Sequence, residues 1–267
     1  MIRNTFLLFS LLLAAVALPQ TSSANHAQVE LVSEVEHVRP GEEFTVAAVV
    51  THDIGWHTYW TNPGSEFGLP LTIKPKLPEG FSARVRFATP HQFQSLGVTG
   101  FGYEGVAVHL IEITPPAELT DEKVKVDISV RVQTCDDSSC SIPETFPLSV
   151  ELPVSSQPKV AGAGAAQIEA ARKKAPKIDT SLDLSAKADG ANLSLTINVP
   201  DGVTFESGDV FFYAGKDGLV ETDSQSVATE DGALVVTLKS PSGSPGSRWL
   251  PLAKSQPDWA FLPAGCS

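Results

Sequence analysis

The sequence predicts an all-β protein with two β-domains joined by a linker that carries a short helix. Short segments of alternating apolar and polar residues recur roughly every 10 residues, and Gly and Pro, 20 of each, separate them. This pattern is typical of a β-sandwich. The strand-like segments fill residues 26–154 and 179–250, whereas 155–178 has the composition of a linker and 251–267 forms a tail.

The strands of the first domain are expected where turn residues enclose an apolar–polar alternation. The strictest alternation predicts a strand over 124–133, because every second residue is Val or Ile and a strand places alternate side chains on one face. The remaining strands are expected at 29–38, 43–52, 56–60, 69–74, 82–87, 106–114 and 145–152.

The linker changes composition, and the second domain returns to a period of two. Residues 165–174 are good helix formers with basic residues at their end, and Pro176 follows. This predicts a short helix that stops before the proline. Asp-Gly pairs mark turns between the later strands. Strands of this smaller domain are expected at 193–199, 210–213 and 234–238.

Residues 1–24 have the features of a secretory signal peptide. Arg3 supplies a positive charge, Phe6–Leu18 is almost wholly apolar, and small residues lead to Ala24, after which we expect cleavage. The apolar run is short for a membrane span, so we expect an exported chain without membrane insertion. The formal charge of −12 argues against nucleic acid or an anionic membrane surface as a partner.

Two of the three cysteines, Cys135 and Cys140, stand at the ends of a short loop, and the third is Cys266. In an oxidising compartment such a pair forms a disulfide at least part of the time. Closing so short a loop stabilises a fold by only about 2 kcal/mol, and strain in a short loop raises the reduction potential. Asp136 and Asp137 raise the pKa of a nearby thiol. The residues therefore favour a disulfide that a partner attacks, or a dithiol that reduces slowly until a partner binds, over a permanently activated nucleophile. A structural hairpin disulfide is the alternative.

Four motifs occur in order between residues 28 and 154. They are GWHTYWTNPG at 55–64, GLP at 68–70, GFGYEG at 100–105, and the cysteine loop continued by IPE at 142–144. Together they resemble the periplasmic N-terminal region of the DsbD/ScsB family of thiol:disulfide interchange proteins. Residues 210–239 also resemble the second β-domain of the ScsB-like branch.

This resemblance implies both a fold and a chemistry. It implies two immunoglobulin-like β-sandwich domains, joined by the linker with its short helix, in a periplasmic protein. It also implies that Cys135 and Cys140 are a redox pair that takes electrons from a membrane electron carrier and passes them to thioredoxin-fold partners. No cofactor and no metal are expected, and the resemblance associates the chain with cytochrome c-type biogenesis.

Two features depart from the family pattern. Full-length members continue into a multi-helix membrane domain and a thioredoxin-like domain, whereas this chain stops at Ser267. We therefore expect the electron donor to be a separate membrane protein; the alternative is that the chain is not a complete relay. Four residues separate the two cysteines, one fewer than in the best-known members, which leaves the geometry of the pair open.

In the DsbD branch an aromatic cap loop shields the cysteines until a partner docks. By position this loop falls at 92–99, where Phe93 and Leu96 are the apolar candidates for the cap. Tyr103 and Glu104 are candidates to orient a thiol. A solvated carboxylate on a turn is the alternative for Glu104.

The remaining candidates are one carboxylate and a group of aromatic residues. Glu144 is close in sequence to Cys140 and is the preferred second carboxylate beside the pair. Alternation places Trp56 and Trp60 on one face of a strand, which predicts packing in the sandwich core. A partner-docking surface that includes Tyr59 is the alternative.

Other functional classes have little support in the residues. His52, His57, His91 and His109 fall in different expected elements, and the chain has one Met, so a metal site is disfavoured. The same counts disfavour a copper-handling role, which only the metal-stress associations of the ScsB branch suggest. No G-x-S-x-G motif occurs, which argues against a hydrolase. Two hypotheses stay open: a thiol:disulfide exchange module with protein-disulfide reductase activity, and a non-enzymatic exported binding or scaffold protein.

Overall fold

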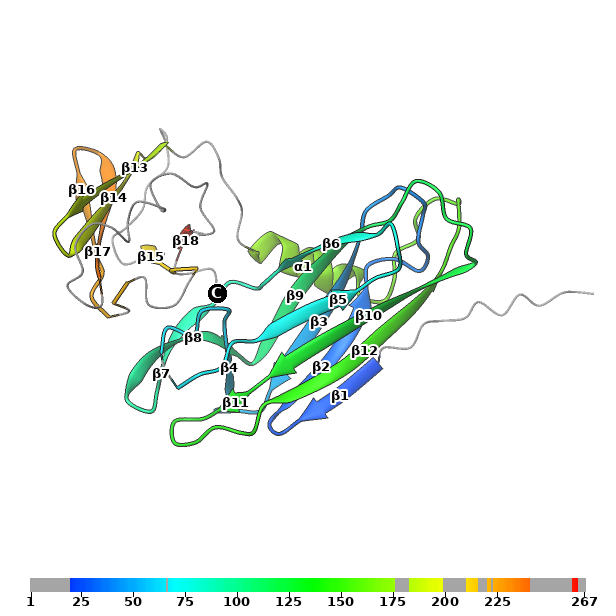
Figure 1. Ribbon diagram of the computed structural model, residues 1–267, viewed down its shortest axis with the longest axis horizontal. Helices are drawn as coiled ribbons and strands as arrows, with labels where there is room; N and C mark the ends of the chain where they lie inside the picture. Colours follow the sequence, from blue (N-terminus) through cyan, green and yellow to red (C-terminus); the bar gives the residue numbers. More distant parts are fainter. Residues whose placement is uncertain are drawn as a thin grey trace, which may run out of the picture.

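The computed structural model describes residues 20–65, 67–175, 183–198, 210–215, 220–221, 223–240 and 261–263. Within these ranges the chain forms antiparallel sheets and one short helix, so the predicted all-β class is confirmed (Figure 1). No helix of the described ranges is long and apolar enough to cross a membrane.

The first domain is a sandwich of two main sheets. One sheet has the strand order β1 (Gln20–Ala24), β2 (Ala27–Ser33), β3 (Phe44–His52), β9 (Val106–Thr114) and β6 (Ser82–Arg86). The facing sheet has the order β12 (Glu144–Pro153), β10 (Lys123–Val132) and β5 (Thr72–Lys76). The strand expected at 69–74 begins later than predicted, because the chain at Pro70 first pairs with Tyr59.

Apolar side chains between these two sheets form the core of the sandwich. The five Val and Ile residues at alternate positions of β10 point inward and are at most 2 % exposed, as the alternation predicts. Val46 of β3 and Ile111 of β9 belong to the same core and are fully buried. Burying each such side chain contributes roughly 1.5–3 kcal/mol, so this core is a main source of the stability of the first domain.

The helix α1 (Ala165–Lys174) has the predicted bounds and packs on the outer face of the first sheet. Its buried Ile168 contacts a cluster that includes Ala47 of β3 and Leu110 of β9. Arg172 near its end donates a hydrogen bond of 2.8 Å to Glu34. Because the helix covers the second face of the sheet, β3 is buried on both faces rather than alternately.

A third sheet closes one end of the sandwich and carries the cysteine loop. Its order is β11 (Thr134–Cys135), β4 (His57–Tyr59), β8 (Val98–Glu104) and β7 (His91–Ser95). Strands β7 and β8 form a hairpin, called hairpin 91–104 below, that sequence patterns did not predict. Its turn is Leu96–Gly97, and the positive φ angles of 53° and 79° are those of a two-residue type I′ turn.

The second domain has a separate small core. One sheet has the order β13 (Asp183–Asp189), β14 (Asn192–Asn198), β17 (Ala233–Lys239) and β16 (Ser226–Glu230). Strand β15 (Val210–Phe212) pairs with β18 (Phe261–Pro263), so part of the predicted tail returns to this domain. Residues 20–24 of the predicted signal peptide form β1 beside β2. The other residues of that segment and most of the tail lie outside the described residues.

The two domains meet at an aromatic cluster. Phe101 of β8 packs edge-to-face on Tyr213, with ring centroids 5.1 Å apart, and the ring of Trp60 lies 6.0 Å from the same tyrosine. Phe211 completes the cluster. The second domain therefore contacts the first at hairpin 91–104 and at the end of β4.

Candidate functional site

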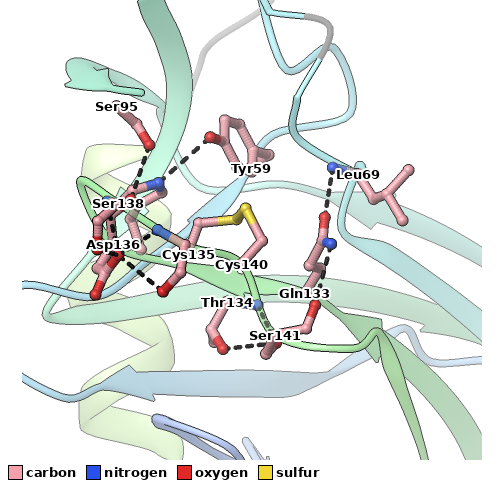
Figure 2. Close-up of a disulfide and its surroundings, with 12 residues drawn as sticks. Tyr59, Leu69, Ser95, Gln133, Thr134, Cys135, Asp136, Ser138, Cys140 and Ser141 are labelled. Carbon is pink, nitrogen blue, oxygen red and sulfur yellow. Dashed lines mark hydrogen bonds between the residues drawn. A yellow bond between two sulfur atoms is a disulfide. The ribbon is translucent and has the colours of Figure 1, made fainter. Parts of the chain in front are cut away.

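Cys135 and Cys140 are joined by a disulfide at the end of the sandwich (Figure 2). Strand β11 ends at Cys135, and Cys140 returns opposite it as an isolated antiparallel bridge, with the two Cα atoms 4.0 Å apart. The backbone N–H of Asp136 donates to the carbonyl of Ser139 at 2.9 Å. The four intervening residues thus form a tight turn, and the bond crosses the base of that turn.

The carboxylate of Asp136 organises this turn. One of its oxygens accepts hydrogen bonds from the backbone N–H of Ser138 at 2.8 Å and of Ser139 at 2.7 Å. The two serine hydroxyls donate to the same oxygen. These donors stabilise the charged form and lower the pKa of Asp136 to about 2. Asp is common at the first position of such turns, because its side chain accepts hydrogen bonds from backbone groups two residues later.

The return arm of the loop is held by side chains of β11 and its neighbours. Gln133 accepts a hydrogen bond of 3.0 Å from the N–H of Leu69 and donates one of 3.1 Å to the carbonyl of Ser141 (Figure 2). The hydroxyl of Thr134 donates to the carbonyl of Asn25 at 2.6 Å. The base of the loop is therefore tied to two distant segments of the first domain, at Asn25 and at Leu69.

The two cysteines differ in their access to solvent. Cys135 is fully buried, at 0 % exposure, whereas Cys140 is exposed. The disulfide therefore joins an exposed residue to an enclosed one.

Hairpin 91–104 lies against the cysteine loop. The hydroxyl of Ser95 donates a hydrogen bond of 3.0 Å to the carbonyl of Asp136 (Figure 2). The ring of Phe93 lies with its centroid 4.1 Å from that of His57 and 5.3 Å from that of Tyr59. Leu96 is at the tip of the turn and is 36 % exposed. The segment expected to form the cap is thus next to the disulfide, and its shielding role stays a prediction.

The other predicted site residues, Tyr103, Glu104 and Glu144, lie in three different environments. Tyr103 is 2 % exposed in the sandwich core, donates to the carbonyl of Ala88 at 2.9 Å, and has its pKa raised by burial. Glu104 is the register partner of His57 and lies 3.4 Å from a ring nitrogen of His91. Glu144 opens β12, after the return arm of the loop. Any role of these three in orienting a thiol stays a prediction.

The aromatic residues of the GWHTYW motif separate in the structure. Tyr59 is 1 % exposed and lies beside the disulfide (Figure 2). Trp60 packs against the sandwich core as predicted. The same prediction is wrong for Trp56, whose ring stacks on His26 at a centroid distance of 3.6 Å, because the strand begins only at His57.

Residues 27–151 match the sequence profile of the family described as thiol:disulfide interchange protein DsbD, N-terminal. This region belongs to the DsbD N-terminal family. Among solved structures, the N-terminal periplasmic domain of ScsB from Proteus mirabilis is similar over 84 % of this chain and 84 % of that chain, at 19 % identity and a TM-score of 0.59. The DsbD N-terminal domain of Neisseria meningitidis in the reduced form matches 50 % of this chain and 84 % of that chain, at 12 % identity and a TM-score of 0.30. No curated protein matches the chain.

The predicted resemblance to the DsbD/ScsB family is therefore confirmed, and so is the immunoglobulin-like fold of the DsbD N-terminal region. The cysteine loop lies inside the DsbD-family region. Within the described residues, no three His, Cys, Asp or Glu side chains gather in a way that could hold a metal ion.

Sequence reasoning missed one residue of this site. His57 is 2 % exposed and is the register partner of Cys135 across β4 and β11. Burial lowers its pKa, so the closed site favours the neutral imidazole. The sequence signal was the alternation that places His57 and Tyr59 on one face of a strand, but the partner strand could not be read from it.

Proposed function

We propose that this chain is a periplasmic thiol:disulfide exchange module that passes electrons between a separate membrane electron carrier and thioredoxin-fold partners through Cys135 and Cys140. The carrying observation is a disulfide with one exposed and one buried cysteine inside a region of the DsbD N-terminal family. The likeness to the N-terminal periplasmic domain of ScsB supports the location.

Exchange begins at the exposed cysteine. A partner thiolate attacks Sγ of Cys140 and forms a mixed disulfide, and the electron pair of the broken bond stays on Sγ of Cys135. The second thiol of the partner then attacks its own bridged sulfur and releases Cys140 as a thiolate. The partner leaves oxidised, and the pair is reduced by two electrons. The reverse sequence reduces an oxidised partner.

Hairpin 91–104 acts as the cap in this proposal. Phe93 covers the inner side of the site, and Ser95 joins the hairpin to the cysteine loop through one hydrogen bond. A docked partner replaces that bond and contacts Leu96 at the tip. One hydrogen bond contributes about 0.5–1.5 kcal/mol, which a modest binding energy can offset.

Capture of a mixed disulfide tests the proposal. In a Cys266→Ser background, Cys135→Ser leaves the exposed thiol without its resolving partner, and Cys140→Ser leaves the buried one. The probe is a purified thioredoxin-fold oxidoreductase that lacks its resolving cysteine and whose remaining cysteine is joined in a mixed disulfide to 5-thio-2-nitrobenzoate. The thiol of the variant attacks the probe's sulfur, and thionitrobenzoate leaves as the thiolate. We expect a stable covalent complex with Cys135→Ser and at least tenfold less with Cys140→Ser. Equal capture would contradict the assignment of Cys140, and no capture by either variant would contradict exchange.

The competing hypothesis is a binding or scaffold sandwich with a structural disulfide. A redox titration of the Cys266→Ser chain against glutathione separates the two. A reduction potential below about −300 mV is typical of structural bridges and would favour the scaffold. A higher potential, together with the covalent complex, supports exchange.

A further inference from the structure

His57 and Cys135 are directly opposite each other on neighbouring antiparallel strands. Such partners point to the same face of the sheet, with Cβ atoms about 4.5–5.5 Å apart. Both residues are buried, at 2 % and 0 % exposure. The imidazole is thus enclosed with the sulfur that carries the electron pair after attack at Cys140.

The imidazole is held in place by aromatic neighbours. Its Nε2 lies 3.4 Å from the hydroxyl of Tyr59, and the ring of Phe93 from hairpin 91–104 covers it at a centroid distance of 4.1 Å. Phe93 therefore covers one side of the buried imidazole. The charged or titratable groups that act on it from the surrounding elements are Glu104 of β8, Asp136 and Asp137 of the cysteine loop, Tyr59 of its own strand and His52 of β3.

A thiolate left on Cys135 has no solvent to stabilise it. Burial disfavours the charged form of a thiol, so the S–S bond opens readily only if a proton or a positive charge is supplied nearby. Histidine is the side chain whose proton exchange falls between about pH 5 and pH 8. Within the described residues, His57 is the imidazole that pairs with Cys135.

We propose that His57 is the acid–base residue of the exchange reaction, which protonates Sγ of Cys135 as the bond opens, and that Phe93 gates it. This inference rests on the proposed function. The partner thiol gives its proton to solvent and attacks Cys140, and the imidazolium gives a proton to Cys135. The neutral imidazole is then reprotonated from water, so the net transfer is one proton from the partner thiol to Cys135.

The gate follows from what Phe93 covers. With the hairpin in place, burial lowers the pKa of His57 and the imidazole is neutral. When a partner moves Phe93 away, water hydrates the ring and the pKa rises toward its usual value. The carboxylates of Glu104, Asp137 and Asp136 favour the cation in the same direction. The proton-bearing form is then available mainly in the open, docked state.

The pH profile of disulfide reduction tests the role of His57. The probe is dithiothreitol, with rate constants corrected for its thiolate fraction, measured on the full chain with Cys266→Ser from about pH 5 to about pH 8. We expect the corrected rate to rise as the pH falls through the imidazole titration, by about tenfold in total. His57→Gln, which keeps a hydrogen-bond donor near Tyr59, should give a flat profile. His91→Gln, the same change at the exposed neighbouring histidine, should keep the slope.

The outcomes separate this inference from the proposed function. A wild-type chain that dithiothreitol does not reduce, together with no covalent complex from either the Cys135→Ser or the Cys140→Ser variant, contradicts the exchange function. A wild-type chain that exchanges normally while His57→Gln retains the pH slope contradicts only the role of His57.

Imidazole titration by NMR provides a measurement that does not require the His57 variant to fold. In the wild-type chain, reduction of the disulfide should shift the titration of His57, because an ionisable thiol then lies opposite it. Phe93→Ala should raise the pKa of His57 toward about 6.5, the usual value for histidine, and Phe67→Ala, which removes an exposed phenyl ring, should leave it unchanged. An unaltered titration in both the reduced chain and Phe93→Ala would overturn the proposal.

Discussion

The side-chain amide of Asn62 donates a hydrogen bond of 2.7 Å to the carbonyl of Ala214, 152 residues later in the chain. Both residues are buried, at 4 % and 2 % exposure. In the same contact region, Phe101 of hairpin 91–104 packs against Tyr213 with ring centroids 5.1 Å apart. The second domain therefore contacts the hairpin that lies against the cysteine loop.

Asn62→Ala is expected to loosen this contact. The buried carbonyl of Ala214 would lose its donor, and a buried group left without a partner costs roughly 1–3 kcal/mol. Amide hydrogen exchange should accelerate in hairpin 91–104, and the unfolding free energy in urea should fall by that amount. Asn198→Ala removes a solvent-exposed amide that bonds Asp183 and should change the free energy by less than about 0.5 kcal/mol. Equal effects of the two variants would contradict a contact between domains.

The helix α1 is expected to contribute to the stability of the first domain. Ile168→Ala removes a fully buried side chain from the cluster between the helix and β3 and β9, which should cost about 2–5 kcal/mol. Urea unfolding followed by circular dichroism measures this. Ile54→Ala changes the same residue type where the side chain is completely exposed, and it should be near neutral. A small effect at Ile168 would indicate that the helix does not stay docked in solution.

Replacing both Cys135 and Cys140 by serine should lower the stability of the folded chain by only about 2 kcal/mol, because the disulfide closes a very short loop. Reduction of the wild-type disulfide should have a similar effect. Urea unfolding of the oxidised chain, the reduced chain and the double variant provides the comparison. Loss of folding in the double variant would show that the bond is essential to the structure and would favour the scaffold hypothesis.

The order of the cysteine loop should depend on the charge of Asp136. Hydrogen bonds to its carboxylate lower the folded pKa to about 2, below the value in an unfolded chain. The stability that the ionised carboxylate of Asp136 gives to the turn is therefore fully present above about pH 4, and it is lost as the pH falls through about 2. The amide resonances of Ser138 and Ser139 should move together over this range.

Asp136→Ala should abolish the pH-dependent shifts of the two serine amides and make the turn less ordered at neutral pH. Asp137→Ala, the adjacent exposed carboxylate, should keep them. Unchanged titration of the two serine amides in Asp136→Ala would show that another group organises the turn.

Local patterns in the sequence predicted several elements well. The helix over 165–174 and the strand over 106–114 have the predicted bounds. The helix follows from helix-forming residues that end before Pro176, and the strand from an apolar segment enclosed by turn residues. The closeness of Cys135 and Cys140 also follows from a short loop. These features depend on residues that are neighbours in the chain.

Sequence patterns did not predict the elements that form only when two separate segments of the chain pack together. Hairpin 91–104 was missed because β7 is polar and largely exposed while β8 is rich in glycine, so neither shows a clear alternation. Gly100 is needed there because a Cβ atom would lie 2.8 Å from the ring of Phe93 and 2.9 Å from that of Tyr59. This requirement is visible only when the three residues are packed together.

By itself, the sequence determined the all-β class, the helix, the disulfide loop and the motifs of the DsbD N-terminal family. The tertiary structure decided that Cys135 is enclosed while Cys140 is exposed, that His57 faces Cys135, and that Asn62 joins the domains. The physical reason is that strand register and burial arise from packing between segments far apart in the chain, and no single segment encodes its partner.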